Sequence, residues 1–338
     1  MGAIKVGVVG CGYWGPNLIR NFVELPTSDL IYVADLKEDR LNHIKDMYPR
    51  VSITKDYGDL LHNSIEAVVI ATPPSTHFNV AKECLEHGLH VMVEKPLTLS
   101  SSEAEILLEL AQKKDLILMV GHTFEYNSAV QALKQLIGSG ELGQIYYVDA
   151  ARLNLGLFQR DLNVLWDLAP HDISILMYLL DQKPISVNAQ GASCVFKGIH
   201  DVVYVNLTFP EDIMAHIHVS WLDPCKIRRI TVVGSKKMAV FNDIDPLGKI
   251  RIYDKGVDAP AYTDTYADWQ CNYRSGDILI PNIRFVEPLR QECQHFLECI
   301  AGHIEPRSSG SDGLKVVKVL EAAQRSLMNV STQEVIQW

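Results

Sequence analysis

The sequence predicts an α/β protein with two domains, of which the first has a doubly wound parallel sheet and the second is α+β with a large open, mostly antiparallel sheet. The length of 338 residues favours two domains over one. From residue 4 to about 122, β-branched runs alternate with amphipathic segments, the pattern of a parallel sheet covered by helices. After residue 122, strand-like runs follow one another with few helices between them. We therefore predict domains at 1–122 and 123–338.

The elements of the first domain follow from residue type. The first run is rich in valine and isoleucine and ends in glycine, which is typical of a buried parallel strand. Pro16 suits the first turn of a helix, where its missing N–H is harmless, and Pro26 stops that helix. Ser101 and Ser102 precede Glu105, which indicates a capping box. The predicted strands are 4–10, 30–34, 67–71, 90–93 and 116–120, and the predicted helices are 16–25, 37–47, 79–87 and 101–114.

The second domain changes rhythm. Its strand-like runs alternate in polarity and support an open, mostly antiparallel or mixed sheet. Residues 254–284 are rich in Asp, Tyr, Gly and Pro without a clean period, and we expect a long loop there. The predicted strands are 146–153, 185–197, 201–209, 213–221, 227–234 and 237–241, and the predicted helices are 128–137, one within 163–180, 289–300 and 314–327.

Composition excludes several classes of function. The net charge of −10 and the lack of a basic run argue against nucleic-acid binding. No apolar run reaches the ~20 residues of a membrane span, and the N-terminus lacks signal-peptide features. The cysteines number seven, without a Cys-x-x-Cys pair, so we expect reduced thiols in a cytoplasmic protein. Cys293, His295 and Cys299 lack a fourth ligand, and we interpret them as helix packing and predict no metal.

A glycine-rich loop follows the first strand and opens the first helix. Its sequence, Gly-Cys-Gly-Tyr-Trp-Gly, fits Gly-x-Gly-x-x-Gly in the strand–helix–strand context that dinucleotide binding requires. The first glycine makes the tight turn, the second admits a pyrophosphate, and the third lets helix and strand pack closely. The helix N-terminus then offers free N–H groups to the phosphates. The predicted cofactor-binding residues of this loop are Gly10, Gly12, Tyr13, Trp14 and Gly15.

Other strand ends supply further cofactor candidates. Asp35 closes the second strand, where a carboxylate accepts hydrogen bonds from a ribose 2′-hydroxyl and repels a 2′-phosphate, which favours NAD over NADP. The alternative is a turn residue without a ligand role. Thr72 and Pro73 follow another strand and are predicted to line the cofactor. His77 is a cofactor candidate that could equally be a surface histidine.

Two segments carry candidate chemistry. Glu94 and Lys95 end a strand on the cofactor side, where an ammonium group could polarise a reacting oxygen, although a strand-end lysine is often only surface charge. Asp167 and His171 are four residues apart and share one face of a helix. A carboxylate beside imidazole fixes its tautomer and raises its basicity, as removal of a hydroxyl proton requires. A packed or solvated pair is the alternative, and Pro170 implies a helix start or a kink nearby.

Taken together, these motifs resemble one known family. The glycine loop, Thr-Pro-Pro, Glu-Lys-Pro and Asp-x-x-x-His follow in the order seen in the glucose–fructose oxidoreductase, inositol dehydrogenase and MocA family. The resemblance implies an N-terminal Rossmann domain and a C-terminal open sheet that packs between subunits of a homodimer or homotetramer. It also implies that Lys95 polarises the substrate oxygen, that His171 is the acid/base and that Asp167 orients His171.

The finer resemblance concerns the substrate. The Trp-Asp-Leu-Ala-Pro-His-Asp segment and residues 273–277 look similar to nucleotide-sugar 3-dehydrogenases acting on UDP-N-acetylglucosamine or its uronic acid, and to sugar 3-ketoreductases of polysaccharide biosynthesis. We expect NAD-dependent hydride transfer at a sugar secondary alcohol. The alternatives are an inositol or free-sugar dehydrogenase, an NAD-assisted glycosidase and a catalytically inactive dinucleotide sensor. Candidate substrate contacts, each balanced against a packing or surface role, are Tyr126, Asn127, Arg152, Asn154 and Arg160.

Overall fold

The computed structural model describes residues 2–258 and 271–338, and the chain forms two compact units. Unit 1 consists of Met1–Tyr126 and Val286–Lys318, and unit 2 consists of Asn127–Phe285 and Val319–Trp338. The predicted boundary at 122 places 286–318 in the second domain, whereas the structure joins these residues to the N-terminal part. This segment returns because Phe296 and Leu297 are buried in the same core as Phe22 of the first helix.

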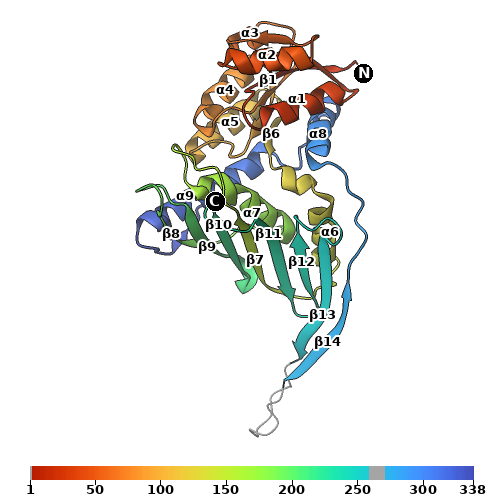
Figure 1. Cartoon of the computed structure of the whole chain (residues 1–338), viewed down its shortest axis with the longest axis vertical. Helices are drawn as coiled ribbons and strands as arrows, with labels where there is room; N and C mark the ends of the chain where they lie inside the picture. The colour runs from red at the N-terminus through yellow and green to blue at the C-terminus, as the bar shows by residue number, and fades with distance from the viewer. Residues whose placement is uncertain (1, 259–270) are drawn as a thin grey trace. The chain divides into compact units, whose positions relative to one another are not determined.

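Unit 1 is built on a parallel sheet, as predicted (Figure 1). Its strand order is β3-β2-β1-β4-β5-β6, so the order reverses between β1 and β4. All of β4 and the three middle residues of β5 are apolar and buried because helices cover both faces of such a sheet. The strands are β1 Ile4–Val9, β2 Ser28–Ala34, β3 Ser52–Thr54, β4 Ala67–Ile70, β5 His90–Glu94 and β6 Leu118–Gly121.

The helices of unit 1 connect and cover these strands. β3 and α3 were not predicted, because three and four residues are too few to show a period. Helix α8 packs against α1 and against the short helix η1. The helices are α1 Gly15–Glu24, α2 Glu38–Met47, α3 Gly58–Leu61, α4 Pro74–Glu86, α5 Ser101–Lys113, η1 Thr123–Tyr126, α8 Pro288–Gly302 and the first part of α9 Gly310–Met328.

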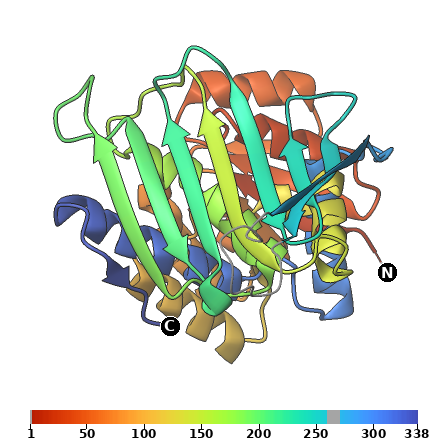
Figure 2. The same cartoon turned by 90° about the horizontal axis from the view of Figure 1, so that it is seen from below.

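Unit 2 contains the open, mostly antiparallel sheet (Figure 2). The strand order is β14-β13-β12-β11-β7-β10-β9-β8-β15. β7 and β10 pair in parallel, and the other neighbouring strands described here pair antiparallel. The strands are β7 Ile145–Leu153, β8 Ser186–Ala192, β9 Val202–Thr208, β10 Met214–Ser220, β11 Ile227–Gly234, β12 Met238–Asn242, β13 Ile250–Asp258, β14 Asn272–Leu279 and β15 Glu334–Val335.

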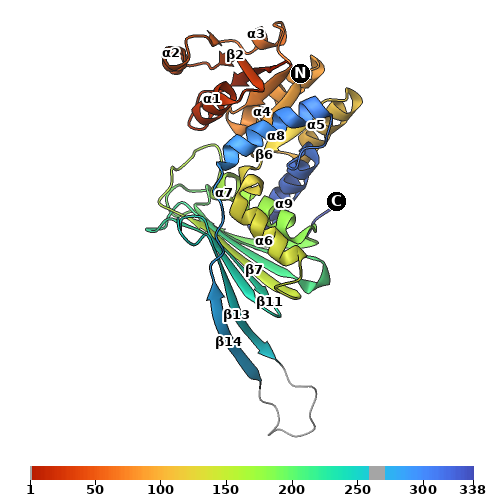
Figure 3. The same cartoon turned by 90° about the vertical axis from the view of Figure 1, so that its right-hand side faces the viewer.

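Helices cover one face of this sheet and leave the other open. Helix α7, Val164–Leu180, packs on β7, β9 and β10, and helix α6, Ser128–Gly138, packs on α7 and β12. Figure 3 views this arrangement edge-on, with both helices on the same side of the strands. A short helix, η2 Pro210–Asp212, joins β9 to β10. The face seen in Figure 2 carries no helix of unit 2 among the described residues.

The predicted loop at 254–284 is wrong for part of its length. Residues 250–258 and 272–279 form β13 and β14, which pair as an antiparallel ribbon at the sheet edge. Nearly every residue of β14 is exposed, so its sequence shows no alternation of apolar and polar residues. The rest of the predicted loop at 259–270 lies outside the described residues. β8 ends at Ala192, five residues before the predicted end of its strand at 197.

No helix within the described residues is long and apolar enough to cross a membrane.

Candidate active site

The phosphate loop lies at the point where the strand order of the parallel sheet reverses. Gly10 begins the turn after β1 with a φ of +105°, a value that glycine adopts readily. A Cβ at this position would lie 2.6 Å from the carbonyl oxygen of Ala71, which follows β4. Gly10 therefore lets the loops after β1 and β4 approach each other. In sheets of this kind, ligands bind outside the carboxyl ends of the strands at such a reversal.

The other glycines of the loop have different tasks. A Cβ on Gly15 would lie only 2.0 Å from the carbonyl oxygen of Gly10, so glycine is needed for the helix to begin there. A Cβ on Gly12 would meet only Arg40 Nη1, at 3.7 Å, so this backbone faces open space. Tyr13 is 87% exposed beside it. The loop thus leaves its backbone accessible at Gly12 and ahead of the first turn of α1, which suits a pyrophosphate.

Asp35 lies at the end of β2 with its carboxylate tied to this loop. Oδ2 accepts a hydrogen bond from the Cys11 N–H at 2.6 Å, and Oδ1 accepts one from the Lys37 N–H at 2.8 Å. Arg40 Nη1 lies 3.7 Å from Oδ2. Each carboxylate oxygen has a further lone pair, so Asp35 can also accept from ribose hydroxyls. These residues fit an NAD molecule at this edge of the sheet.

Glu94 connects the phosphate loop to the lysine after β5. Its carboxyl group accepts a hydrogen bond from the Trp14 side chain, and Oε2 lies 3.3 Å from the Lys95 backbone N–H. Burial raises the pKa of Glu94 to about 7, against the lowering effects of Lys95 and Trp14. The side chain of Lys95 is partly exposed beyond the strand end. Glu94 therefore contacts both the phosphate loop, through the Trp14 side chain, and the backbone of Lys95.

A buried acidic residue that the sequence analysis missed lies near Glu94. Glu292 on α8 is fully buried, and its Oε2 accepts a hydrogen bond from the Thr123 hydroxyl at 2.7 Å. Burial, and then the charge of Glu94, raise the pKa of Glu292 well above its usual range. Burial also lowers the pKa of His122 to about 4. An acid among Leu289, Cys293 and the other apolar positions of this helix face was the signal that the sequence offered.

His77 corrects both interpretations made from the sequence. The side chain is fully buried, so it faces neither cofactor nor solvent. Its ring nitrogens lie 2.8 Å from the carbonyl oxygens of Thr72 and Pro96. His77 therefore links the loop after β4, in which Pro73 caps α4, to the loop that contains Lys95. Its contribution to a cofactor site is to hold these loops.

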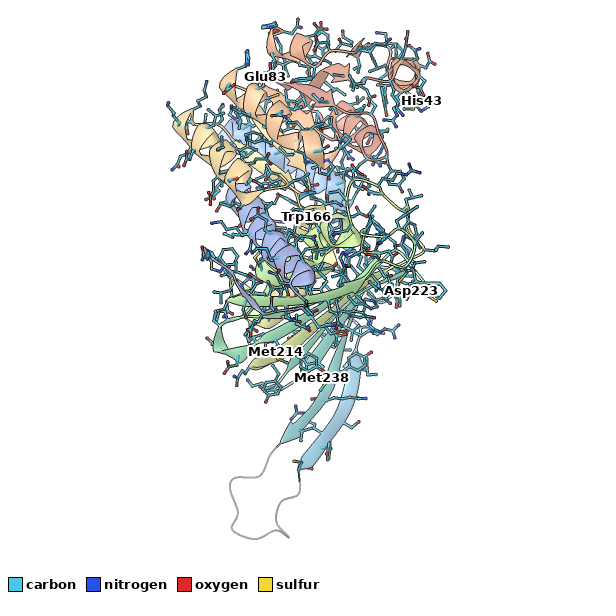
Figure 4. All side chains as sticks on the ribbon, turned by 90° about the vertical axis from the view of Figure 1, so that its left-hand side faces the viewer. His43, Glu83, Trp166, Met214, Asp223 and Met238 are labelled. Atoms are coloured by element: carbon cyan, nitrogen blue, oxygen red, sulfur yellow. The ribbon has the colours of Figure 1, made fainter. Side chains whose placement is uncertain are left out.

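Unit 2 places Asp167 and His171 on α7. Asn163 caps the helix by accepting a hydrogen bond from the Trp166 N–H, and the helix continues through Pro170. Between residues 164 and 176, only Asp167, Leu168 and His171 are partly exposed. Figure 4 labels Trp166, the neighbour of Asp167 on this helix. The predicted i, i+4 pair thus lies on the accessible face of an otherwise buried helix.

Arg152 is not an accessible substrate contact, contrary to one reading of the sequence. It is 5% exposed and pairs with Asp172 of α7, with Nε–Oδ2 at 2.7 Å and Nη2–Oδ1 at 3.0 Å. This bidentate geometry is the strongest form of the arginine–carboxylate pair. Asp172 directly follows His171, so the ion pair fixes the helix against β7 at the turn that carries the histidine.

Trp221 is a second contact that the sequence analysis missed. It follows β10, is 1% exposed, and donates a hydrogen bond from Nε1 to Asp167 Oδ2 at 3.0 Å. No motif or spacing in the sequence pairs these residues, which lie 54 positions apart. The contact arises only from the packing of α7 on β10.

The other predicted substrate residues divide into buried and accessible ones. Tyr126 is 1% exposed, and its hydroxyl lies 3.0 Å from His295 Nδ1, so it packs inside unit 1. Asn127 caps α6 and lines a pocket of about 460 Å³ in unit 2 together with Asp243 and Lys249. Asn154 is half-buried and Arg160 is exposed. Asn154 and Arg160 therefore remain open to a substrate role.

The described residues contain no group of three or more histidine, cysteine or acidic side chains arranged to hold a metal ion. On α8, Cys299 Sγ lies 3.5 Å from His295 Nε2, and Cys293 is buried in the core of unit 1.

Unit 1 has the features of a Rossmann-type, NAD-binding domain of an oxidoreductase. These are a parallel sheet whose strand order reverses between β1 and β4, an accessible glycine loop at that point, and Asp35 after β2. The chain belongs to the GFO/IDH/MocA family, as the resemblance predicted. Residues 4–122 match the family model described as "Oxidoreductase family, NAD-binding Rossmann fold", and residues 130–240 match the "GFO/IDH/MocA C-terminal domain".

Similar proteins act on several substrates. A UDP-N-acetylglucosamine 3-dehydrogenase of Acidithiobacillus ferrooxidans is 27% identical over 95% of both chains, and its solved structure matches with a TM-score of 0.79 at 25% identity over 98% of this chain and 100% of that one. A myo-inositol 2-dehydrogenase of Thermotoga maritima is 24% identical over 98% of this chain and 100% of its own. GenD2 from gentamicin A biosynthesis, solved with NAD, has a TM-score of 0.84 at 22% identity over 100% and 97% of the chains, which shows a shared fold.

Replacing single glycines should separate folding from cofactor binding. We expect Gly15→Ala to lower the free energy of unfolding by roughly 3 kcal/mol or more, because its Cβ overlaps the Gly10 carbonyl. Gly12→Ala should fold with near-normal stability, because its Cβ meets open space, and should bind NAD at least about tenfold more weakly. Thermal unfolding and NAD titration by calorimetry measure the two effects. Equal stability of both variants would contradict this division of tasks.

The buried carboxyl of Glu94 predicts a pH-dependent stability. The pKa of Glu94 is about 7 in the folded protein, against 4.5 for an ordinary glutamate. The folded protein therefore gains its full stability from the protonated carboxyl below pH 4.5, and it loses this contribution as pH rises through 7. Glu94→Gln stays neutral. We expect its free energy of unfolding, relative to wild type, to rise by up to about 3 kcal/mol between these pH values and then level off. A difference that does not change with pH would refute the buried titration.

Proposed function

We propose that this protein transfers hydride reversibly between NAD and a secondary alcohol of a sugar, specifically C3 of a UDP-linked amino sugar or its uronic acid. Two observations, one in each unit, carry the proposal. Asp167 and His171 are the accessible polar residues on the N-terminal half of α7, and Lys95 ends β5 in the NAD-binding unit. The relative that acts on UDP-N-acetylglucosamine supports the choice of substrate class.

The proposed reaction divides the work between the units. When bound, NAD supplies the hydride acceptor at its nicotinamide ring. His171 takes the proton of the sugar hydroxyl as the C–H bond breaks and the carbonyl forms. The ammonium of Lys95 stabilises the negative charge that develops on this oxygen, and Asp167 orients the imidazole. Asn154 and Arg160 are the accessible candidates for sugar or phosphate contacts.

The open sheet face is the proposed contact between copies of the chain in a homodimer or homotetramer. Met214, labelled in Figure 4, is 63% exposed and Tyr147 is 45% exposed. Tyr204, 42% exposed, stacks on His218 with ring centroids 4.2 Å apart. A partly apolar face of this kind is typical of an interaction surface. Light scattering that finds only monomers would contradict this proposal.

We also place the enzyme in the cytoplasm and in polysaccharide biosynthesis, in line with the proposed nucleotide-sugar substrate.

The substrate is tested by following NADH absorbance with NAD and a panel of sugars. We expect turnover with UDP-N-acetylglucosamine or its uronic acid to exceed turnover with free sugars. The inositol dehydrogenase relative makes myo-inositol the informative competitor. Preference for inositol would replace the proposed substrate while keeping the hydride-transfer chemistry. Release of a free sugar without NADH would instead indicate glycoside cleavage.

The role of His171 is tested by replacement. We expect His171→Asn to lower kcat by roughly 100-fold or more, because the hydroxyl proton loses its acceptor. NAD affinity measured by calorimetry should change less than about twofold, because the phosphate loop is intact. His62→Asn, a replacement in unit 1 at the end of α3, is the matched control and should retain wild-type kcat. Near-normal turnover in His171→Asn would rule out the assignment.

A further inference from the structure

We infer that Trp221 is a positioning residue for the acid/base pair, which rests on the proposed function of Asp167 and His171. The indole of Trp221 donates its N–H to the carboxylate of Asp167, from a strand end that nothing in the sequence connects to the helix. An indole N–H can only donate, so it holds one carboxylate oxygen by a lone pair and leaves the other oxygen for further contacts. In this way Trp221 sets the direction in which Asp167 faces His171.

Neighbouring residues hold both the backbone and the indole of Trp221. The backbone N–H of Trp221 donates to the Asp201 backbone carbonyl at 2.9 Å, and the Trp221 backbone carbonyl accepts from the Gly156 N–H at 2.9 Å. A Cβ on Gly156 would lie 2.9 Å from the indole Cδ1, so glycine lets the loop after β7 lie against the ring. The ring of Phe158 packs with its centroid 5.5 Å away. A side chain so confined cannot turn its N–H away from Asp167 without moving its neighbours.

The same contacts connect α7 to the segment between β7 and α7. Gly156 and Phe158 lie in the segment between β7 and α7, which also contains Asn154 and Arg160. Trp221 is therefore the common neighbour of Asp167 and of the loop that offers the accessible substrate candidates. A positioning residue placed there affects both the orientation of the base and the seating of the sugar.

Other charges near α7 are tied to partners of their own. Arg152 of β7 pairs with Asp172, and Lys134 of α6 donates to the Tyr178 carbonyl. Asp149 on β7 lies 2.9 Å from His216 Nδ1 of β10. Further titratable or charged groups near α7 include His218 on β10, Tyr204 on β9, Tyr146 and Tyr147 on β7, Glu141 after α6, His200 and Asp201 before β9, and Glu321 and Arg325 on α9. The Trp221→Phe replacement keeps all of these side chains and the Trp221 backbone bond to Asp201, and the side-chain hydrogen bond it removes is the one to Asp167.

The first test removes the indole N–H and keeps an aromatic ring at position 221. In Trp221→Phe, the carboxylate of Asp167 loses the hydrogen bond from the indole N–H. Its negative charge is then less well stabilised and favours the protonated imidazole of His171 more strongly. We expect the midpoint of the His171 titration, followed by NMR on protein with 13C-labelled histidine, to rise by about half a pH unit. His171→Asn identifies the resonance among the 12 histidines. The acidic limb of the kcat profile should move by the same amount, and kcat should fall roughly tenfold.

Two further variants separate positioning from packing. Phe158→Leu loosens the ring packing around Trp221 but keeps the N–H, so we expect a lower Tm with an unchanged His171 midpoint. If Trp221→Phe does not fold, the benzothiophene analogue of tryptophan at position 221 replaces it, because this analogue has the shape of indole with sulfur in place of N–H. It should give the same rise in the midpoint with near-normal Tm.

The outcomes distinguish this inference from the proposed function. A His171 midpoint that stays constant or falls in both N–H-deficient proteins overturns the role of Trp221, and so does an equal rise in Phe158→Leu. The proposed function fails separately, if His171→Asn keeps near-normal turnover. The NMR midpoint is measured without cofactor or substrate, so it tests Trp221 whichever sugar the enzyme uses.

Discussion

The orientation of α7 on the open sheet is the constraint on which the proposed chemistry depends. The Arg152–Asp172 pair joins the helix to β7 by two hydrogen bonds inside the protein, where removal of one partner would leave an uncompensated charge. Asp172 follows His171 directly, and successive residues of a helix point about 100° apart. Fixing Asp172 toward the sheet therefore turns His171 toward the accessible side, together with Asp167 one turn earlier.

The NAD-binding unit must bind an anionic dinucleotide although the chain has a net charge of −10. The global field opposes such a ligand, so local features must bind it. The open backbone at Gly12 and the start of α1 supply N–H groups. The buried carboxyls of Glu94 and Glu292 both have raised pKa values, which limits the negative charge close to the site. Glu94 also contacts both the Trp14 side chain and the Lys95 backbone, so it links the phosphate loop to the lysine after β5.

Much of the fold could be predicted because parallel strands and their ends leave local marks in the sequence. Gly10, Gly15 and Lys95 each follow or flank a strand, and the family resemblance connected them. The antiparallel ribbon of β13 and β14 was missed because an exposed strand has no apolar face to give it a period. Arg152 was a candidate substrate contact with packing as the alternative, and the sequence alone did not decide between the two roles. Its partner Asp172 is set by tertiary packing, as is the contact of Trp221 with Asp167.

The central proposal is that Lys95 of unit 1 and His171 of unit 2 act on the same oxygen of a sugar. The most direct measurement is a crystal structure of the protein with NAD and UDP-N-acetylglucosamine. The account predicts that the Lys95 ammonium and a ring nitrogen of His171 both lie within about 3.2 Å of one sugar hydroxyl, whose carbon faces the nicotinamide C4. A complex in which either group points away from that hydroxyl would contradict it.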